Sequence, residues 1–187
     1  GDVVKTSRGG EIRFVPSPLL AEEPPIDMQH IRRMGAEQSN SSINLDDRMA
    51  FKIYRRLQPG ANPEVEIGRF LTDTAHFMNA PPTLGVVEHV DGDGIVTAVG
   101  ILQRFVRNQG DAWTWTLNVL TRMMDALALT SAQNTSDVIQ GFVSYISHMR
   151  RLGFRTVEMH KALSTTTDDP ASAAQSLTIE DVQHFVV

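Results

Sequence analysis

The stretch of sequence that decides the fold spans residues 35–71 and reads GAEQSNSSINLDDRMAFKIYRRLQPGANPEVEIGRFL. Within it, residues 49–57 begin with MAFKIY, a mostly apolar run whose composition predicts a β-strand. Lys52 lies inside this run. A lysine in a buried strand is costly unless it is paired, so the sequence predicts an anionic partner for Lys52.

A helix is predicted after this strand, over residues 63–77. Asn62 can cap its first turn, and the proline that follows suits the first helical position. Glu64 and Glu66 then fall in the first turn, where the helix dipole favours negative charge. They flank the apolar stripe of the helix from opposite sides, so the spacing leaves open which of them pairs with Lys52. The alternative is that both glutamates are solvated and that Lys52 is an edge-strand charge.

The chain changes character near residue 110. Before it, short alternating runs are separated by Gly, Pro and Asp, and DGDG at 91–94 is a hairpin signal because glycine tolerates positive φ. After it, apolar residues recur at helical spacing, and Gly153 is expected to end one of the helices. We therefore predict an α+β chain, with an antiparallel sheet and one packed helix over residues 1–110 and a mainly α-helical segment over residues 111–187.

Composition argues against several classes of protein. Of the 187 residues, 41% are hydrophobic and 21% are charged, enough for one sizeable core or two small subdomains. The net charge of -5 and the scattered basic residues predict no nucleic-acid partner. There is no cysteine and the six histidines show no ligand spacing, so no metal site is predicted. Without a long apolar run, we expect a cytoplasmic protein with no membrane partner.

The order of polar loop, strand lysine and helix carboxylate is the order in which a kinase amino-terminal lobe presents its nucleotide site. Four stretches carry a closer resemblance. They are GAEQSNSS at 35–42, FKIYRRLQPGANPEVEIGRFL at 51–71, QRFVRNQGDAWTWTL at 103–117 and LGFRTVEMHKAL at 152–163. On these motifs the chain resembles the maltokinase family, most closely the maltokinase-like region of bacterial trehalose synthase fusion proteins.

The resemblance implies an ATP-dependent sugar kinase that makes maltose 1-phosphate from maltose. ATP and Mg would be cofactors of the intact protein, and a trehalose synthase barrel domain would belong to the same parent chain. Residues 1–110 would form the kinase-like amino-terminal lobe, with 1–30 as the end of a preceding cap. The implied nucleotide-binding residues are Lys52 on the phosphates, Glu66 orienting Lys52, Ser39, Asn40 and Ser41 in a phosphate-covering loop over 36–42, and Gln103, Phe105 and Val106 in a hinge that meets adenine.

The chain also departs from the family pattern. The later His-Gly-Asp motif, which supplies the catalytic aspartate of relatives, does not occur. We therefore expect no catalytic residue here, and we interpret the chain as part of a larger enzyme, inactive alone. The segment 35–42 has a single glycine, so an ordinary Ser- and Asn-rich turn is the alternative to a phosphate loop. The other function left open is a non-catalytic interaction or scaffold domain attached to trehalose synthase.

Overall fold

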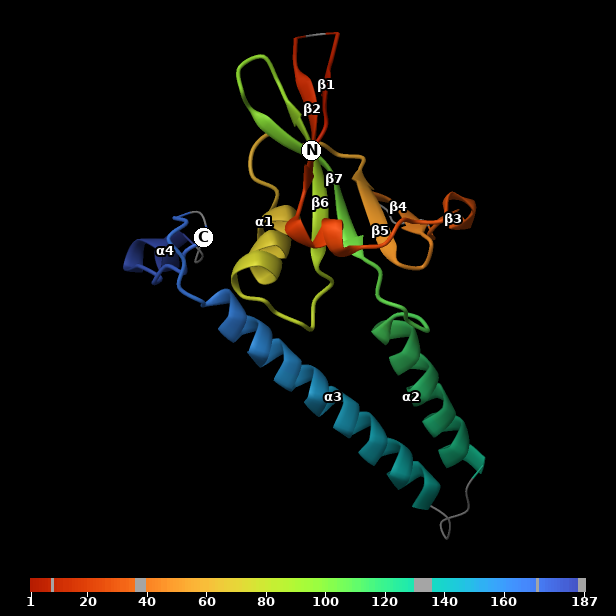
Figure 1. Cartoon of the computed structure of the whole chain (residues 1–187). Coiled ribbons are helices and arrows are strands. Elements are labelled where there is room, and N and C mark those ends of the chain that lie inside the picture. The colour runs from red at the N-terminus through yellow and green to blue at the C-terminus, as the bar shows by residue number, and fades with distance from the viewer. Residues whose placement is uncertain (8, 36–39, 130–135, 171, 185–187) are drawn as a thin grey trace. The chain divides into compact units, whose positions relative to one another are not determined.

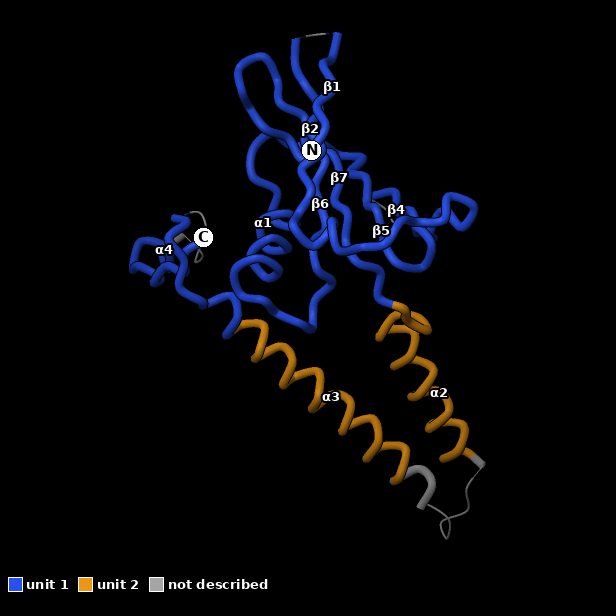
Figure 2. The backbone as a smooth tube through the Cα atoms, in the orientation of Figure 1, with its two compact units in different colours: residues 1–106, 161–187 blue, residues 107–160 orange. Residues whose placement is uncertain are grey.

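The computed structural model describes residues 1–7, 9–35, 40–129, 136–170 and 172–184. The chain forms two compact units, one of residues 1–106 together with 161–187 and the other of residues 107–160 (Figure 2). The division into 1–110 and 111–187 stays a prediction; in these units residues 107–110 belong with the second unit and residues 161–187 with the first.

One antiparallel sheet dominates the first unit (Figure 1). Within the described residues its strands occur in the order β1-β2-β6-β7-β5-β4-β3, and every neighbouring pair is antiparallel. The strands are β1 (Val3–Lys5), β2 (Glu11–Pro16), β3 (Ile31–Arg33), β4 (Asn40–Leu45), β5 (Met49–Tyr54), β6 (Thr83–Val90) and β7 (Val96–Arg104). The predicted α+β class with an antiparallel sheet is confirmed. So is the hairpin at 91–94, where Gly94 has φ 84° and donates its N–H to Asp91 O at 3.2 Å.

The helices of the described chain fall before, between and after these strands. They are the 3₁₀-helices η1 (Pro18–Glu22) and η2 (Met28–His30), α1 (Pro63–Arg69), the π-helix η3 (Phe70–Thr74), α2 (Ala112–Leu129), α3 (Ser136–Leu163) and α4 (Ile179–His184). The predicted end of a helix at Gly153 is wrong, because α3 continues through it. A glycine inside a helix costs only about 1 kcal/mol relative to alanine, which a 28-residue helix tolerates. None of the described helices is both long and apolar enough to cross a membrane.

The core of the first unit lies between α1 and one face of the inner strands. Its buried cluster is Tyr54, Val65, Val86, Ala98 and Ile101. Ile101 of β7 lies opposite Val86 of β6, and directly opposed residues share a face, so both side chains point towards α1. Figure 1 shows α1 alongside β6. Val65, the buried residue of α1, thus packs against this face, and its burial fixes which side of the sheet the helix covers.

In the second unit α2 and α3 meet through side chains on one face of each helix. The Trp115 ring stacks on Tyr145 with centroids 5.6 Å apart, and it lies 5.3 Å from the His148 ring. Met123 is 7% exposed and packs against Gly141. Large apolar side chains elsewhere on α2 stay exposed, namely Trp113, Leu117, Leu120, Met124 and Leu127.

Candidate functional site

Lys52 lies on β5, an inner strand of the sheet. Its register partners are Ile101 on β7 and Ser42 on β4. Because opposed residues share a face, the Lys52 side chain leaves the sheet on the side that α1 covers. It keeps 26% of its exposure. Lys52 therefore lies at the margin of the core, with its ammonium within reach of α1. This position agrees with the prediction of a strand lysine that needs an anionic partner.

The anionic partner of Lys52 is Glu64, in the first turn of α1. Lys52 Nζ donates to Glu64 Oε1 at 2.8 Å, and the Glu64 side chain is 36% exposed. Ion pairs with this degree of exposure contribute about 0.2–1 kcal/mol to stability. The stabilisation is small, so the main consequence of the pair is geometric: the Lys52 ammonium is held at one place above the sheet.

The choice of Glu66 as the partner of Lys52 is wrong. Glu66 is exposed, and it lines a small polar cavity of about 230 Å³ with Arg69 and Asp73. Residues two apart on an α-helix point to different sides, so only one of the two glutamates can face β5. The rotation of α1 on the sheet selects Glu64. That rotation depends on tertiary packing, which the spacing of the two residues does not contain.

The loop before α1 fixes where the helix begins. Gly60 has φ 92° and donates its N–H to Val96 O at 2.8 Å, which ties the loop to β7. Asn62 then caps the helix as predicted: its Oδ1 accepts from the N–H groups of Glu64 at 3.0 Å and Val65 at 3.3 Å. The cap therefore binds the backbone of the very residue whose carboxylate pairs with Lys52.

Close packing between α1 and β6 sets the distance between the helix and the sheet. A Cβ at Gly68 would lie 2.7 Å from Thr83 Oγ1, so no larger residue fits there without displacement. Thr72 Oγ1 donates to Gly68 O at 2.7 Å and accepts from Thr83 N at 2.9 Å. Arg69 Nη2 also lies 3.2 Å from Glu88 Oε1 on β6. These contacts hold the carboxyl-terminal part of α1 against the sheet.

One positional requirement was not anticipated from the sequence. A Cβ at Gly100 of β7 would lie 2.7 Å from Lys52 O and 3.0 Å from a ring carbon of Phe51. Glycine is therefore required where β7 passes the lysine. The signal was present, because a glycine inside a strand pattern, here AVGILQRF, marks a close backbone approach.

The segment predicted as a phosphate-covering loop is partly a strand. Asn40 and Ser41 belong to β4, in register with Tyr54 and Ile53 of β5. Their assignment to the loop is wrong, because pairing with β5 extends this strand further towards the amino terminus than the polar composition indicated. Ser39 lies outside the described residues, as do residues 36–38. A nucleotide contact by Ser39, Asn40 or Ser41 stays a prediction.

The predicted hinge leaves the sheet at the end of β7. Gln103 lies within β7, in register with both neighbouring strands. Phe105 follows β7, and its N–H donates to Arg48 O at 2.7 Å. Val106 has a side chain that is 55% exposed. The Phe105 N–H is thus already hydrogen-bonded within the protein. A ligand that binds the backbone of this segment would have to use its other N–H or C=O groups. Contact of these three residues with adenine stays a prediction.

Glu23 forms ion pairs with Arg104, at the end of β7, and with Arg48, just before β5. Its Oε1 accepts from Arg104 Nε at 2.8 Å and Nη2 at 2.5 Å, and its Oε2 lies 3.4 Å from Arg48 Nη2. The Glu23 side chain is only 11% exposed. The hydrogen bonds from Arg104 are the largest reason that the pKa of Glu23 lies below its usual value, although burial acts in the opposite direction. Arg48 and Arg104 are thereby joined through one carboxylate.

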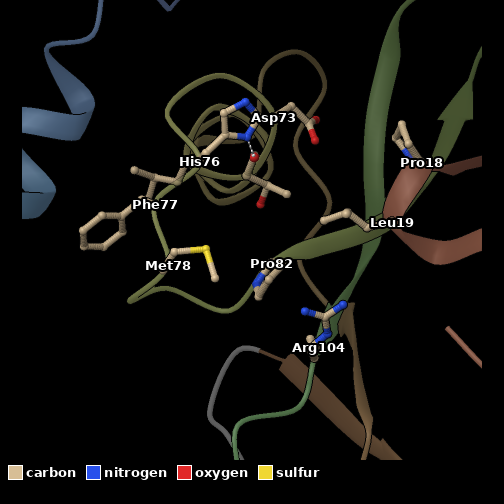
Figure 3. A pocket seen from close by; sticks show the side chains of 10 residues that line it. Pro18, Leu19, Asp73, His76, Phe77, Met78, Pro82 and Arg104 are labelled. Atoms are coloured by element: carbon tan, nitrogen blue, oxygen red, sulfur yellow. Dashed lines mark hydrogen bonds between the residues drawn. The ribbon is translucent and has the colours of Figure 1, made fainter. Parts of the chain in front are cut away.

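A cavity of about 530 Å³ lies beside η3 (Figure 3). It is lined by Pro18, Leu19, Leu71, Thr72, Asp73, His76, Phe77, Met78, Pro82 and Arg104. His76 adopts φ 48°, and its Nδ1 lies 3.0 Å from Thr72 O. Neither Lys52 nor Glu64 is among the lining residues, so this cavity and the ion pair are separate features. Among the residues that the structure describes, no three His, Asp or Glu side chains gather as metal ligands would.

Comparison with known proteins identifies the fold. No known family profile matches the chain. A structure of glucosamine kinase in complex with glucosamine, ADP and inorganic phosphate matches 99% of this chain and 49% of its own, with a TM-score of 0.56 and 14% identity. A second glucosamine kinase structure (crystal form B) matches 99% of this chain and 50% of its own, with a TM-score of 0.51 and 17% identity.

The class of protein that these matches define is a fold class. The chain has a kinase-like α+β fold similar to that of glucosamine kinase, a sugar kinase. It spans about half the length of the glucosamine kinases it matches. At these identities the likeness concerns the fold alone, and the chemistry has to be argued from the residues of this chain.

Proposed function

We propose that this chain is the ATP-binding part of a maltokinase-type sugar kinase, which transfers the γ-phosphoryl group of ATP to maltose and forms maltose 1-phosphate. The observation that carries the proposal is the Lys52–Glu64 ion pair, which joins an inner strand to the first turn of α1 in a kinase-like fold. The narrower assignment to maltokinases rests on the sequence motifs described above.

In this proposal Lys52 binds the phosphates as a compact positive charge, and Glu64 keeps its ammonium in position. The residues present suit a nucleotide: a cation held at the edge of the core, a hairpin of β3 and β4 beside it, and a hinge braced by Arg48 and Arg104. When bound there, ATP would supply the phosphoryl group, and Mg would neutralise part of the charge on the phosphates. Glu64 now takes the orienting role that the resemblance had given to Glu66.

The transfer forms a bond between the anomeric oxygen of maltose and the γ-phosphorus, and it breaks the bond between that phosphorus and the β,γ-bridging oxygen, releasing ADP. The hydroxyl proton must pass to a base. Because no His-Gly-Asp motif occurs, we propose that the base, the Mg ligands and the acceptor site belong to residues outside this chain. The exposed apolar side of α2 supports a larger enzyme of which this chain is a part.

The matched glucosamine kinase, whose structure holds glucosamine and ADP, supports a sugar kinase of some kind. We further propose that the parent protein carries a trehalose synthase barrel domain, which would interconvert maltose and trehalose. This part of the proposal rests on the sequence resemblance. It is tested by whether the full-length protein converts trehalose to maltose without ATP.

The test of the kinase function uses the full-length protein with ATP, Mg and either maltose or glucosamine, and follows sugar phosphate by ³¹P NMR. We expect maltose-dependent formation of a sugar 1-phosphate. Lys52→Ala should lower kcat/KM on the order of 100-fold, and Glu64→Gln should weaken ATP binding, whereas the exposed Glu66→Gln serves as a matched control with little change. Phosphorylation of glucosamine alone would overturn the maltose assignment, and full activity in Lys52→Ala would overturn the site.

A further inference from the structure

Tyr54, the last residue of β5, buries a polar group that the fold alone does not explain. Its side chain is 8% exposed. Its Oη is fully buried, and among the described residues no group is placed to form a good hydrogen bond with it. A buried hydroxyl without a partner is destabilising, and in native proteins such a group usually has a role. Phenylalanine would fill the same space without this cost.

The surroundings of Tyr54 indicate Glu64 as the acceptor for its hydroxyl. Tyr54 lies two residues after Lys52 on β5, so both side chains leave the sheet on the same face. In the core it packs in a cluster with Val65, the residue that follows Glu64 on α1. Burial, and then the nearby Glu64 carboxylate, raise the pKa of the Tyr54 phenol. The phenol therefore keeps its proton and remains a donor beside a carboxylate.

The second carboxylate oxygen of Glu64 can accept a hydrogen bond. Glu64 Oε1 accepts from Lys52 Nζ, and its backbone N–H is held by Asn62. The Lys52 hydrogen bond engages one of the two carboxylate oxygens, and the torsion about the last side-chain bond of a glutamate is soft. An acceptor bond from Tyr54 Oη would remove this freedom, and hydrogen bonds to charged groups are the stronger kind.

We propose that Tyr54 is a positioning residue whose hydroxyl donates to the second carboxylate oxygen of Glu64, so that Glu64 is held by Lys52 at Oε1 and by Tyr54 at Oε2. The Lys52 ammonium is then fixed through a three-residue chain that runs from the core to the phosphate side. Its consequence for nucleotide affinity rests on the proposed function, whereas the hydrogen bond itself does not.

The first arm of the test needs no nucleotide. Tyrosine labelled with ¹³C at Cζ is introduced into the full-length protein, and Tyr54→Phe identifies the Tyr54 signal. We expect Glu64→Gln to move this signal, because the Cζ shift responds to the hydrogen bond of the hydroxyl, and we expect Glu66→Gln to leave it in place. A Tyr54 signal that is unmoved by Glu64→Gln overturns the inference, whether or not the protein binds ATP.

The second arm measures ATP binding and turnover. Tyr54→Phe should raise the KM for ATP about tenfold, as expected for a lost hydrogen bond to a charged group, with kcat less affected. In a Glu64→Ala background the same substitution should add almost nothing, because the acceptor is no longer present. Equal effects of Tyr54→Phe in both backgrounds would overturn the positioning role. Absence of ATP binding in the wild-type protein would instead overturn the proposed function and leave the first arm decisive for the hydrogen bond.

Discussion

Gly100 of β7 faces the carbonyl oxygen of Lys52 so closely that a Cβ at residue 100 would lie 2.7 Å from it. The same Cβ would press on the ring of Phe51 at 3.0 Å. Both neighbours are held in the middle of the sheet, where β5 pairs with β4 on its other side. The position of the Lys52 backbone thus depends on the absence of a side chain on the adjacent strand.

Gly100→Ala should therefore destabilise the protein by about 1–3 kcal/mol, the usual cost of overpacking a core. Urea unfolding followed by circular dichroism measures the change. The matched control is Gly153→Ala in α3, where an added Cβ meets nothing within 4 Å and should raise stability by up to about 1 kcal/mol. Equal stability of Gly100→Ala and wild type would show that β5 and β7 can separate at this point without cost.

Loss of the Asn62 cap should loosen the helix that carries Glu64. In Asn62→Ala the N–H groups of Glu64 and Val65 lose the acceptor that they share. The expected cost is about 1 kcal/mol, whereas Asn62→Asp, which keeps an acceptor at the helix start, should stay close to wild type. Thermal unfolding of the three proteins tests this order. A stability of Asn62→Ala equal to that of Asn62→Asp would show that water replaces the cap.

Thr72 links the π-helix to the sheet. Its Oγ1 is the acceptor for Thr83 N, and Thr83 is only 1% exposed. Thr72→Val keeps the shape and removes the acceptor, leaving a buried N–H unpaired at a cost of about 1–3 kcal/mol. Thr74→Val, at an exposed position of the same π-helix, should change stability by less than about 0.5 kcal/mol. Hydrogen exchange at the Thr83 amide should become faster in Thr72→Val alone.

The sequence correctly predicted the features that are determined by residues adjacent in the chain. The strand around Lys52, the Asn62 cap and the DGDG hairpin each follow from residues that lie next to one another, and the structure confirms all three. The partner of the lysine could not be read in this way. Glu64 and Glu66 suit the first turn equally well, and the Gly68 contact with Thr83, which helps to seat α1, joins residues 15 apart in the chain.

The amino-terminal end of β4 shows the same limit. Asn40 and Ser41 are polar and have no local signal for a strand, yet pairing with β5 makes them one. Tyr54 was recognised only as part of an apolar run, because its contact with the surroundings of Glu64 depends on where the helix crosses the strand. Register and helix seating are long-range properties, so these parts of the site required the structure.

Acid should unfold the protein partly through Glu23. The pKa of Glu23 in the folded protein lies below its ordinary value of 4.5, chiefly because of the hydrogen bonds from Arg104. A carboxylate with a lowered pKa contributes stability above its unfolded pKa, and this contribution disappears as the pH falls through the folded pKa. Stability should therefore fall as the pH drops below about 4.5.

Glu23→Gln should be less stable than wild type at neutral pH, with a smaller further loss on acidification. The control is Glu22→Gln, at the exposed neighbouring position, which should keep the wild-type profile. Urea midpoints between pH 7 and pH 3 measure the three curves, and parallel curves for Glu23→Gln and wild type would exclude Glu23 as a source of the acid sensitivity.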